Sequence, residues 1–148
     1  LQSKSRQLKR IYISRNAGVQ RRTINEDEVL NILNERGFTK IFAESISFAE
    51  QVALMARAEV VVLMHGSAVS NLVFCQPGTK VIEIFSPHQV VQIGELISHY
   101  QKLDYYYMIG SGIECPHLRQ LVYDRDGYED TLVNIDSLKN LLEQAGVA

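Results

Sequence analysis

The chain of 148 residues lacks the features that mark several specialised classes of protein. Its two cysteines, Cys75 and Cys115, are too few for a disulfide framework and therefore favour a reducing compartment. No apolar run approaches the roughly 18 residues that cross a membrane, and the polar, basic residues 1–10 lack the apolar segment of a signal peptide. We therefore expect a cytoplasmic domain without a transmembrane segment. Any peripheral association with a membrane would be made by other parts of a longer protein. A longer protein is expected because the chain begins with Leu1 instead of methionine.

Acidic side chains are absent from residues 1–25, although this stretch holds seven of the 15 lysines and arginines. All 17 acidic side chains lie in the rest of the chain, so the net charge of −2 conceals a basic opening on an acidic body. This asymmetry favours a local anion site over a nucleic-acid surface. A solvated leader explains the charge of residues 4–10 equally well. Nucleic-acid binding is the weaker alternative because aromatic residues are not interleaved with these cations.

Apolar residues make up 46% of the chain and charged residues 22%, which is typical of a globular protein. The length suits one domain over residues 1–148. Apolar runs alternate with amphipathic segments along the chain. The runs predict strands at 11–13, 39–43, 60–64, 81–85 and 104–109, with short edge strands at 121–123 and 132–135. The segments between them predict helices at 25–37, 47–58, 67–74, 87–100 and 136–146.

This alternation predicts an α/β fold of the Rossmann-like, three-layer αβα type with a mainly parallel sheet. We expect at least five strands in the order 3-2-1-4-5. The continuously apolar Val60–Met64 is expected to be buried on both faces and away from a sheet edge. Asn25 with Glu28, and Ser47 with Glu50, predict capping boxes at two helix starts.

Ligands of open parallel sheets bind beyond the carboxyl ends of the strands, where the strand order reverses. The residues that follow the predicted strands are therefore the candidates for a binding site. These candidates are Ser14 and Arg15, Glu44, His65 to Ser67, and Glu83 to Ser86.

His65-Gly66-Ser67 stands where a buried strand passes into a helix. Gly66 lets the backbone come close to a ligand, and the first amides of the following helix are free to bind phosphate. Ser67 adds a hydroxyl, and His65 adds a hydrogen-bond donor. The alternative is an ordinary helix start, with a serine cap and a packed histidine.

Arg15 directly follows the first strand, so its position is fixed, and its guanidinium is suited to grip phosphate. Arg21 and Arg22 lie in the same loop and are either further phosphate ligands or solvated surface residues. Glu83 interrupts an apolar strand, and a buried carboxylate needs partners. Those partners are either ribose hydroxyls or a neighbouring arginine. Asn71 either reaches the ligand or caps a loop.

Well-defined motifs for nucleotide binding, metal binding or thiol chemistry are absent, or have a simpler structural explanation. Neither a P-loop nor a dinucleotide-binding glycine pattern is present. The D-x-D pattern at 124–126 is followed by Gly127, so it indicates a turn instead of a metal site. Cys75 lies among apolar residues, which favours a buried structural thiol. Cys115 and His117 are too few ligands for zinc.

The candidate residues also resemble a known family in their order and spacing. The resemblance is to the carboxyl-terminal half of glycosyltransferase family 61, which includes plant β-1,2-xylosyltransferases, animal O-linked GlcNAc transferases and bacterial capsular polysaccharide biosynthesis proteins. It covers about residues 10–85. It is carried by Ile13-Ser14-Arg15, Arg21-Arg22, Asn25-Glu26, Ser47 to Gln51, His65-Gly66, Asn71, Phe74, Pro77-Gly78 and Glu83.

The resemblance implies one half of a GT-B glycosyltransferase, in which two Rossmann-like halves face each other. It implies an inverting enzyme that uses a nucleotide-sugar, commonly a UDP-sugar, as substrate and needs no metal or other cofactor. The acceptor is expected to be a glycan, polysaccharide or protein-linked sugar, bound by an amino-terminal half that this chain lacks. The nucleotide and diphosphate are then expected at Ser14, Arg15, Arg22, His65, Gly66, Ser67 and Asn71, and the ribose at Glu83.

The alternative function is a non-catalytic, Rossmann-like module that binds a nucleotide or supports assembly. Both functions predict nucleotide binding, so only sugar transfer by the whole protein separates them.

Overall fold

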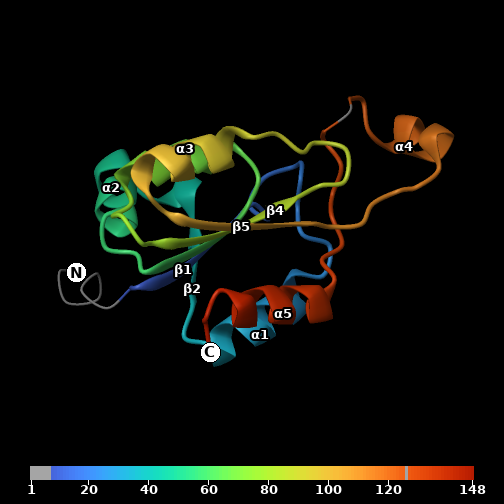
Figure 1. Cartoon of the computed structure of the whole chain (residues 1–148). Helices are drawn as coiled ribbons and strands as arrows, with labels where there is room; N and C mark the ends of the chain where they lie inside the picture. The colour runs from blue at the N-terminus through green and yellow to red at the C-terminus, as the bar shows by residue number, and fades with distance from the viewer. Residues whose placement is uncertain (1–7, 126) are drawn as a thin grey trace.

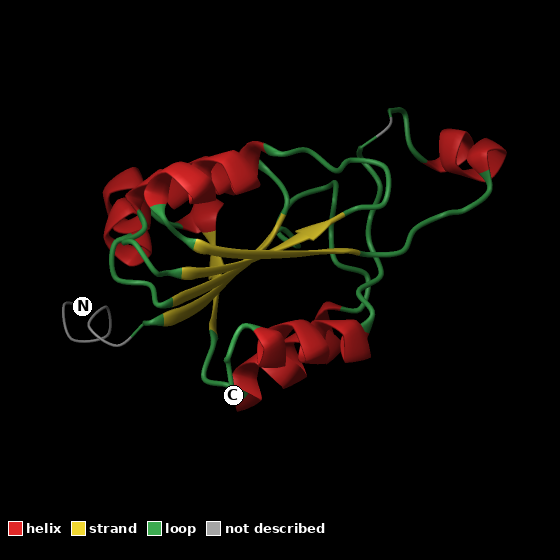
Figure 2. Cartoon of the chain, in the orientation of Figure 1, coloured by secondary structure: helices red, strands yellow, loops and turns green. Residues whose placement is uncertain are grey.

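The computed structural model describes residues 8–125 and 127–148 and contains a five-stranded parallel sheet between two layers of helices (Figures 1 and 2). The α/β prediction is therefore confirmed. The strands are β1 (Arg10–Ser14), β2 (Thr39–Phe42), β3 (Val60–Met64), β4 (Lys80–Phe85) and β5 (Asp104–Ile109). The helices are α1 (Glu26–Glu35), η1 (Ala43–Ser45), α2 (Phe48–Met55), η2 (Ser67–Phe74), α3 (Ile93–Gln101), α4 (Pro116–Val122) and α5 (Ile135–Gln144).

Two hydrophobic cores lie on opposite faces of the sheet. Helices α1 and α5 cover one face, and α2 and α3 cover the other (Figure 1). Alternate residues of each strand enter different cores, as the two-residue period of a strand requires. In β1, Tyr12 packs on the side of α1 and α5, whereas Ile11 and Ile13 pack on the other side.

The strand order is β2-β1-β3-β4-β5, so the predicted order 3-2-1-4-5 is wrong. The predicted order would have placed Val60–Met64 at an edge, in conflict with its expected interior position. All five residues of β3 are buried, and the strand pairs with β1 and β4, which confirms the interior position. The chain runs from β1 outward to β2 and then crosses back to β3. The carboxyl ends of β1 and β3 therefore flank the switch point at which such sheets bind ligands.

One of the two predicted capping boxes is present in the structure. The capping box of Ser47 and Glu50 is present at α2. Asn25 holds the N-cap position of α1, but its side chain makes no capping bond and instead bonds twice to the backbone of Val133. The cap of α5 is Asn134, so this helix begins at Ile135, one residue before the predicted start at 136.

Two other segments differ from their predictions. Helix α3 begins at Ile93 instead of Pro87; the segment before it is irregular, and in it His88 contacts the buried Glu129. Residues 121–123 were predicted as a strand, but Pro116 occupies the first turn of α4, which continues to Val122. Of residues 132–135, only Leu132 makes an isolated bridge, to Ser111. Asp126 of the D-x-D pattern lies outside the described residues.

The segment after β3 is a 3-10 helix with a three-residue period. Every third residue from Val69 is buried: Val69 is 1% exposed, Leu72 0% and Cys75 3%. A second row, at 68, 71 and 74, is half-buried, and a third, at 67, 70 and 73, is exposed. This pattern follows from the three residues per turn of a 3-10 helix.

Candidate functional site

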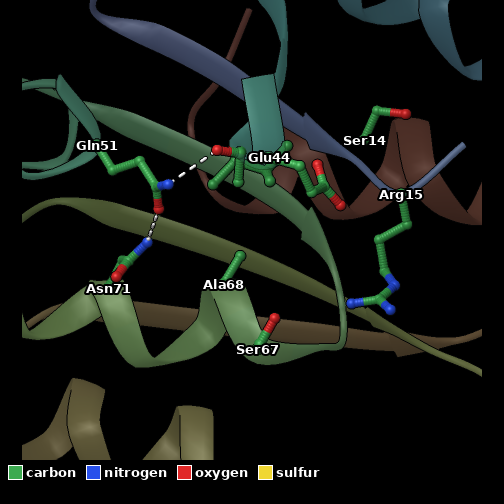
Figure 3. Close-up of a pocket in the computed structure, with 9 residues that line it drawn as sticks. Ser14, Arg15, Glu44, Gln51, Ser67, Ala68 and Asn71 are labelled. Atoms are coloured by element: carbon green, nitrogen blue, oxygen red, sulfur yellow. Dashed lines mark hydrogen bonds between the residues drawn. The ribbon is translucent and has the colours of Figure 1, made fainter. Parts of the chain in front are cut away.

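A cavity of about 250 Å³ opens at the carboxyl ends of β1 and β3. Arg15 reaches it from the end of β1, Glu44 from η1, and Ser67 and Ala68 from the start of η2 (Figure 3). The structure thus brings together residues that are far apart in the sequence, at the edge where parallel strands were expected to place them. Its lining residues are Ile13, Ser14, Arg15, Ala43, Glu44, Gln51, Ser67, Ala68 and Asn71.

Arg15 and Gly66 are in direct contact across this edge. A Cβ atom added to Gly66 would lie 1.8 Å from Nη1 of Arg15 and 2.7 Å from its Cζ. The φ of Gly66 is 171°, which is extended backbone that any residue adopts. Glycine is therefore needed at this position for space, because a side chain would occupy the place of the Arg15 guanidinium.

The half-buried Arg15 carries charge that the protein does not fully offset. Burial lowers its pKa, and the nearby cation of Arg21 lowers it further, while Glu44 acts in the opposite direction. Its Nε atom is buried without a hydrogen-bond partner among the described residues. An anion bound here would favour the charged guanidinium and satisfy its donors.

Ser14 lies at the cavity, but its hydroxyl is already engaged. It donates to the carboxylate of Glu26, which also accepts from the hydroxyl of Tyr12 at 3.1 Å and pairs with Lys40. Burial, the largest cause, raises the pKa of Tyr12, and Glu26 raises it further. The buried Glu26 thus joins α1 to β1 and β2 behind the cavity. Sequence reasoning named Glu26 only within the family resemblance, because an acid in a first helical turn usually faces solvent.

Gln51 fixes the far wall of the cavity. Its side-chain amide donates to the carbonyl of Ala43 at 2.8 Å, and its carbonyl accepts from Nδ2 of Asn71 at 2.7 Å (Figure 3). These two bonds connect α2 to the segment after β2 and to η2. The predicted Asn71 therefore lines the cavity and also supports it, and Gln51 is a lining residue that was not among the predicted ligands.

Arg22 does not line the cavity. Its Nη2 lies 2.7 Å from Oδ2 of Asp130, its Nε 3.1 Å from the same oxygen, and its backbone amide bonds to the other oxygen. The hydrogen bond and charge of Asp130 raise the pKa of Arg22. The predicted diphosphate role of Arg22 would require it to leave this partner.

His65 and Glu83 lie outside the cavity lining and contact each other. Nδ1 of His65 is 2.6 Å from Oε1 of Glu83, and the hydroxyl of Tyr105 donates to Oε2 at 2.6 Å. The Glu83 side chain is 0% exposed. Its partners are a histidine and a tyrosine, not the arginine that the sequence suggested, and the predicted ribose contact would have to displace one of them.

The fold and the site define a class: a parallel α/β domain with a polar pocket at its switch point, lined by one arginine and one glutamate. Comparison with known proteins makes the class specific. The family model for glycosyltransferase 61 matches residues 1–82, which is more than half of the chain and includes every residue that lines the cavity. The chain therefore belongs to glycosyltransferase family 61.

The chain is also similar to the β-1,2-xylosyltransferase RCN11 of Oryza sativa subsp. japonica, with 33% identity over 99 residues. The match covers 60% of this chain and 18% of that protein, so the matched stretch spans less than a fifth of the relative's length. Within the described residues, no helix is long and apolar enough to span a bilayer.

Proposed function

We propose that this chain is the donor-binding part of an inverting glycosyltransferase and holds the diphosphate of a nucleotide-sugar, most simply a UDP-sugar. The observation that carries the proposal is the Arg15 guanidinium, packed on Gly66 at the switch point and lacking a partner for its buried Nε. Membership of glycosyltransferase family 61 supplies the reaction class. A glycan or protein-linked sugar is the proposed acceptor.

The arrangement suits stabilisation of a leaving group. Sugar transfer breaks the bond from the anomeric carbon to the diphosphate, and the electron pair leaves with the nucleoside diphosphate. Arg15 and the first amides of η2, at Ser67 and Ala68, would stabilise that charge without a metal ion. A base supplied by the rest of the protein would take the proton of the acceptor hydroxyl.

The cavity is large enough for only part of a nucleotide-sugar. Pockets that enclose whole ligands occupy about 300–1,000 Å³, whereas this one measures about 250 Å³. We therefore place the diphosphate and the adjoining sugar here, with Glu44 and Asn71 within the lining as hydroxyl partners. The nucleoside would extend beyond the cavity.

The test is calorimetric titration of the chain with UDP-xylose, a donor chosen because the rice relative is named a xylosyltransferase. The wild-type chain should bind UDP-xylose more tightly than uridine, and Arg15→Ala should remove most of that difference. Equal affinity for the two ligands would refute a diphosphate site. Xylose transfer by the whole protein, lost in the same variant, would separate an enzyme from a non-catalytic nucleotide-binding module.

A further inference from the structure

The loop between β1 and α1 is joined along its second half to residues 128–133. The backbone amide of Thr131 donates to the carbonyl of Arg22 at 2.8 Å, and the amide of Ile24 donates to the carbonyl of Thr131 at 2.9 Å. Residues 128–133 lie beyond residues 1–82, the part of the chain that the family model matches. A segment outside the matched stretch therefore holds a loop that starts at the cavity.

Asp130 is the centre of this junction. Its carboxylate accepts three hydrogen bonds from Arg22, one from the backbone amide at 2.8 Å and two from the guanidinium at 2.7 and 3.1 Å. The amide of Asp130 itself donates to the hydroxyl of Tyr123 at 3.2 Å. Exposed single ion pairs contribute little to stability, but the Asp130 side chain is only 14% exposed and binds the main chain and the side chain of one residue together. Asp130 therefore fixes the backbone of Arg22 as well as its charge.

The junction is linked to Arg15 through Thr23, the residue that follows Arg22. The side chain of Asn16 donates to the carbonyl of Thr23 at 3.0 Å and accepts from its amide at 2.8 Å. Asn16 directly follows Arg15 in the sequence. Thr23 is 2% exposed and forms a bridge with Thr131. A shift of the junction is therefore transmitted to the backbone that carries Arg15.

Arg21, the residue before the junction, shows that the loop is held under constraint. Its φ is 55°, in the left-handed region that costs free energy in residues other than glycine. Its charge is close enough to Arg15 to lower the pKa of that guanidinium. The strained backbone and the repulsion between the two cations both favour an open loop, and the contacts of Asp130 oppose this opening.

We propose that Asp130 and Arg22 are positioning residues for donor binding, because their pairing holds the loop so that Arg15 faces the diphosphate. This inference rests on the proposed function. It gives Arg22 a different role from the direct diphosphate contact that the family resemblance implies. Arg22 stays paired when the donor binds, and Arg21 adds positive charge beside the site without lining the cavity.

The two roles of Arg22 predict different effects of Asp130→Ala on UDP-xylose affinity, measured by calorimetric titration. If Arg22 were a direct phosphate ligand, Asp130→Ala would release it, and affinity would stay the same or rise. As a positioning residue it would lose its support, so affinity should fall by up to about tenfold, the loss expected for Arg15 itself. Arg22→Ala should cause the same loss, and the double variant should lose no more than either single variant.

Two further variants serve as controls. Asp130→Asn keeps a side-chain oxygen for the amide of Arg22 and should lose less affinity than Asp130→Ala. Glu59→Ala breaks the exposed ion pair with Lys9 beside the start of β3 and should leave affinity unchanged.

A second measurement needs no ligand. Amide hydrogen exchange of residues 16–24 should be faster in Asp130→Ala than in the wild-type chain, whereas exchange in β3 should stay slow. If Asp130→Ala does not fold, Asp130→Asn takes its place in both measurements and should change them in the same direction.

Unchanged exchange in residues 16–24 would overturn the inference. Unchanged or higher donor affinity in Asp130→Ala would also overturn it, as would losses that multiply in the double variant. These results would leave the donor site in place as long as Arg15→Ala still weakens binding. No binding of UDP-xylose by the wild-type chain would refute the donor site itself, and the role of Asp130 with it.

Discussion

The contact between Arg15 and Gly66 predicts how much donor affinity the variants Arg15→Ala and Gly66→Ala should lose. Gly66→Ala adds one carbon atom where the guanidinium now lies, 1.8 Å from Nη1, so Arg15 must move. The extended backbone of Gly66 accepts alanine without strain, so thermal stability should change little. Gly66→Ala should therefore weaken donor binding mainly by displacing Arg15.

The size of the loss follows from the exposure of Arg15. A hydrogen bond to a charged group contributes about 1.5–3 kcal/mol, and the half-exposed position favours the lower end because solvent and salt screen the charge. A loss of about 1.4 kcal/mol is about tenfold in affinity. Arg15→Ala and Gly66→Ala should each lose about tenfold, and the double variant should lose about tenfold as well, because both changes remove one contact.

The assay is UDP-xylose affinity for the wild-type chain and the three variants at low and high salt. Lys9→Ala is the matched control, since Lys9 is an exposed cation beside the amino end of β1, paired with Glu59. It should leave affinity unchanged, and uridine affinity should be the same for all five proteins. Losses that multiply in the double variant would refute the reasoning, as would wild-type affinity in Gly66→Ala beside a loss in Arg15→Ala.

Three other predictions concern stability and accessibility. With a thiol reagent at pH 8, the exposed Cys115 should react at once and Cys75 only after unfolding, because burial raises the pKa of Cys75 to about 12; prompt reaction of two thiols would contradict the packing. Glu26→Gln should lower the free energy of unfolding by about 1–3 kcal/mol, because Lys40, Ser14 and Tyr12 lose a buried charged partner. The control Glu28→Gln, exposed in the same helical turn, should change it by less than about 0.5 kcal/mol, and equal denaturation curves for the two variants would show that the contacts of Glu26 add no stability. Gly94→Ala should gain about 1 kcal/mol in helix propensity but lose about 1–3 kcal/mol by crowding the buried carboxylate of β4, so a higher melting temperature would argue against that contact.

Local patterns determined much of the fold that sequence reasoning recovered. The apolar runs of β3 and β5 gave their bounds, and Ser47 with Glu50 marked the start of α2. The strand order was beyond such patterns, because it depends on which side of β1 each crossover passes. A fully apolar strand does require an interior place, and that argument alone would have rejected an order with Val60–Met64 at the edge.

The sequence correctly predicted those site residues whose location depends only on their place at the end of a strand. Arg15 and Ser67 follow strands that end at one edge, so parallel pairing brings them together. Arg22 was assigned to the diphosphate through the family resemblance, and its partner Asp130, 108 residues away, could not be foreseen from the sequence around it. The bond from Tyr105 to Glu83 likewise depends on the pairing of β4 with β5, which no local pattern encodes.

The three-residue period of η2 restricts how the length of this segment can change. Each residue of a 3-10 helix turns the chain by about 120°. Deleting one residue from η2 would therefore bring the exposed row at 67, 70 and 73 under the sheet or into the cavity. Deleting or inserting three residues would restore all three rows, as it would not in an α-helix with 3.6 residues per turn. Among natural relatives, length changes between Gly66 and Pro77 should therefore be absent or come in steps of three.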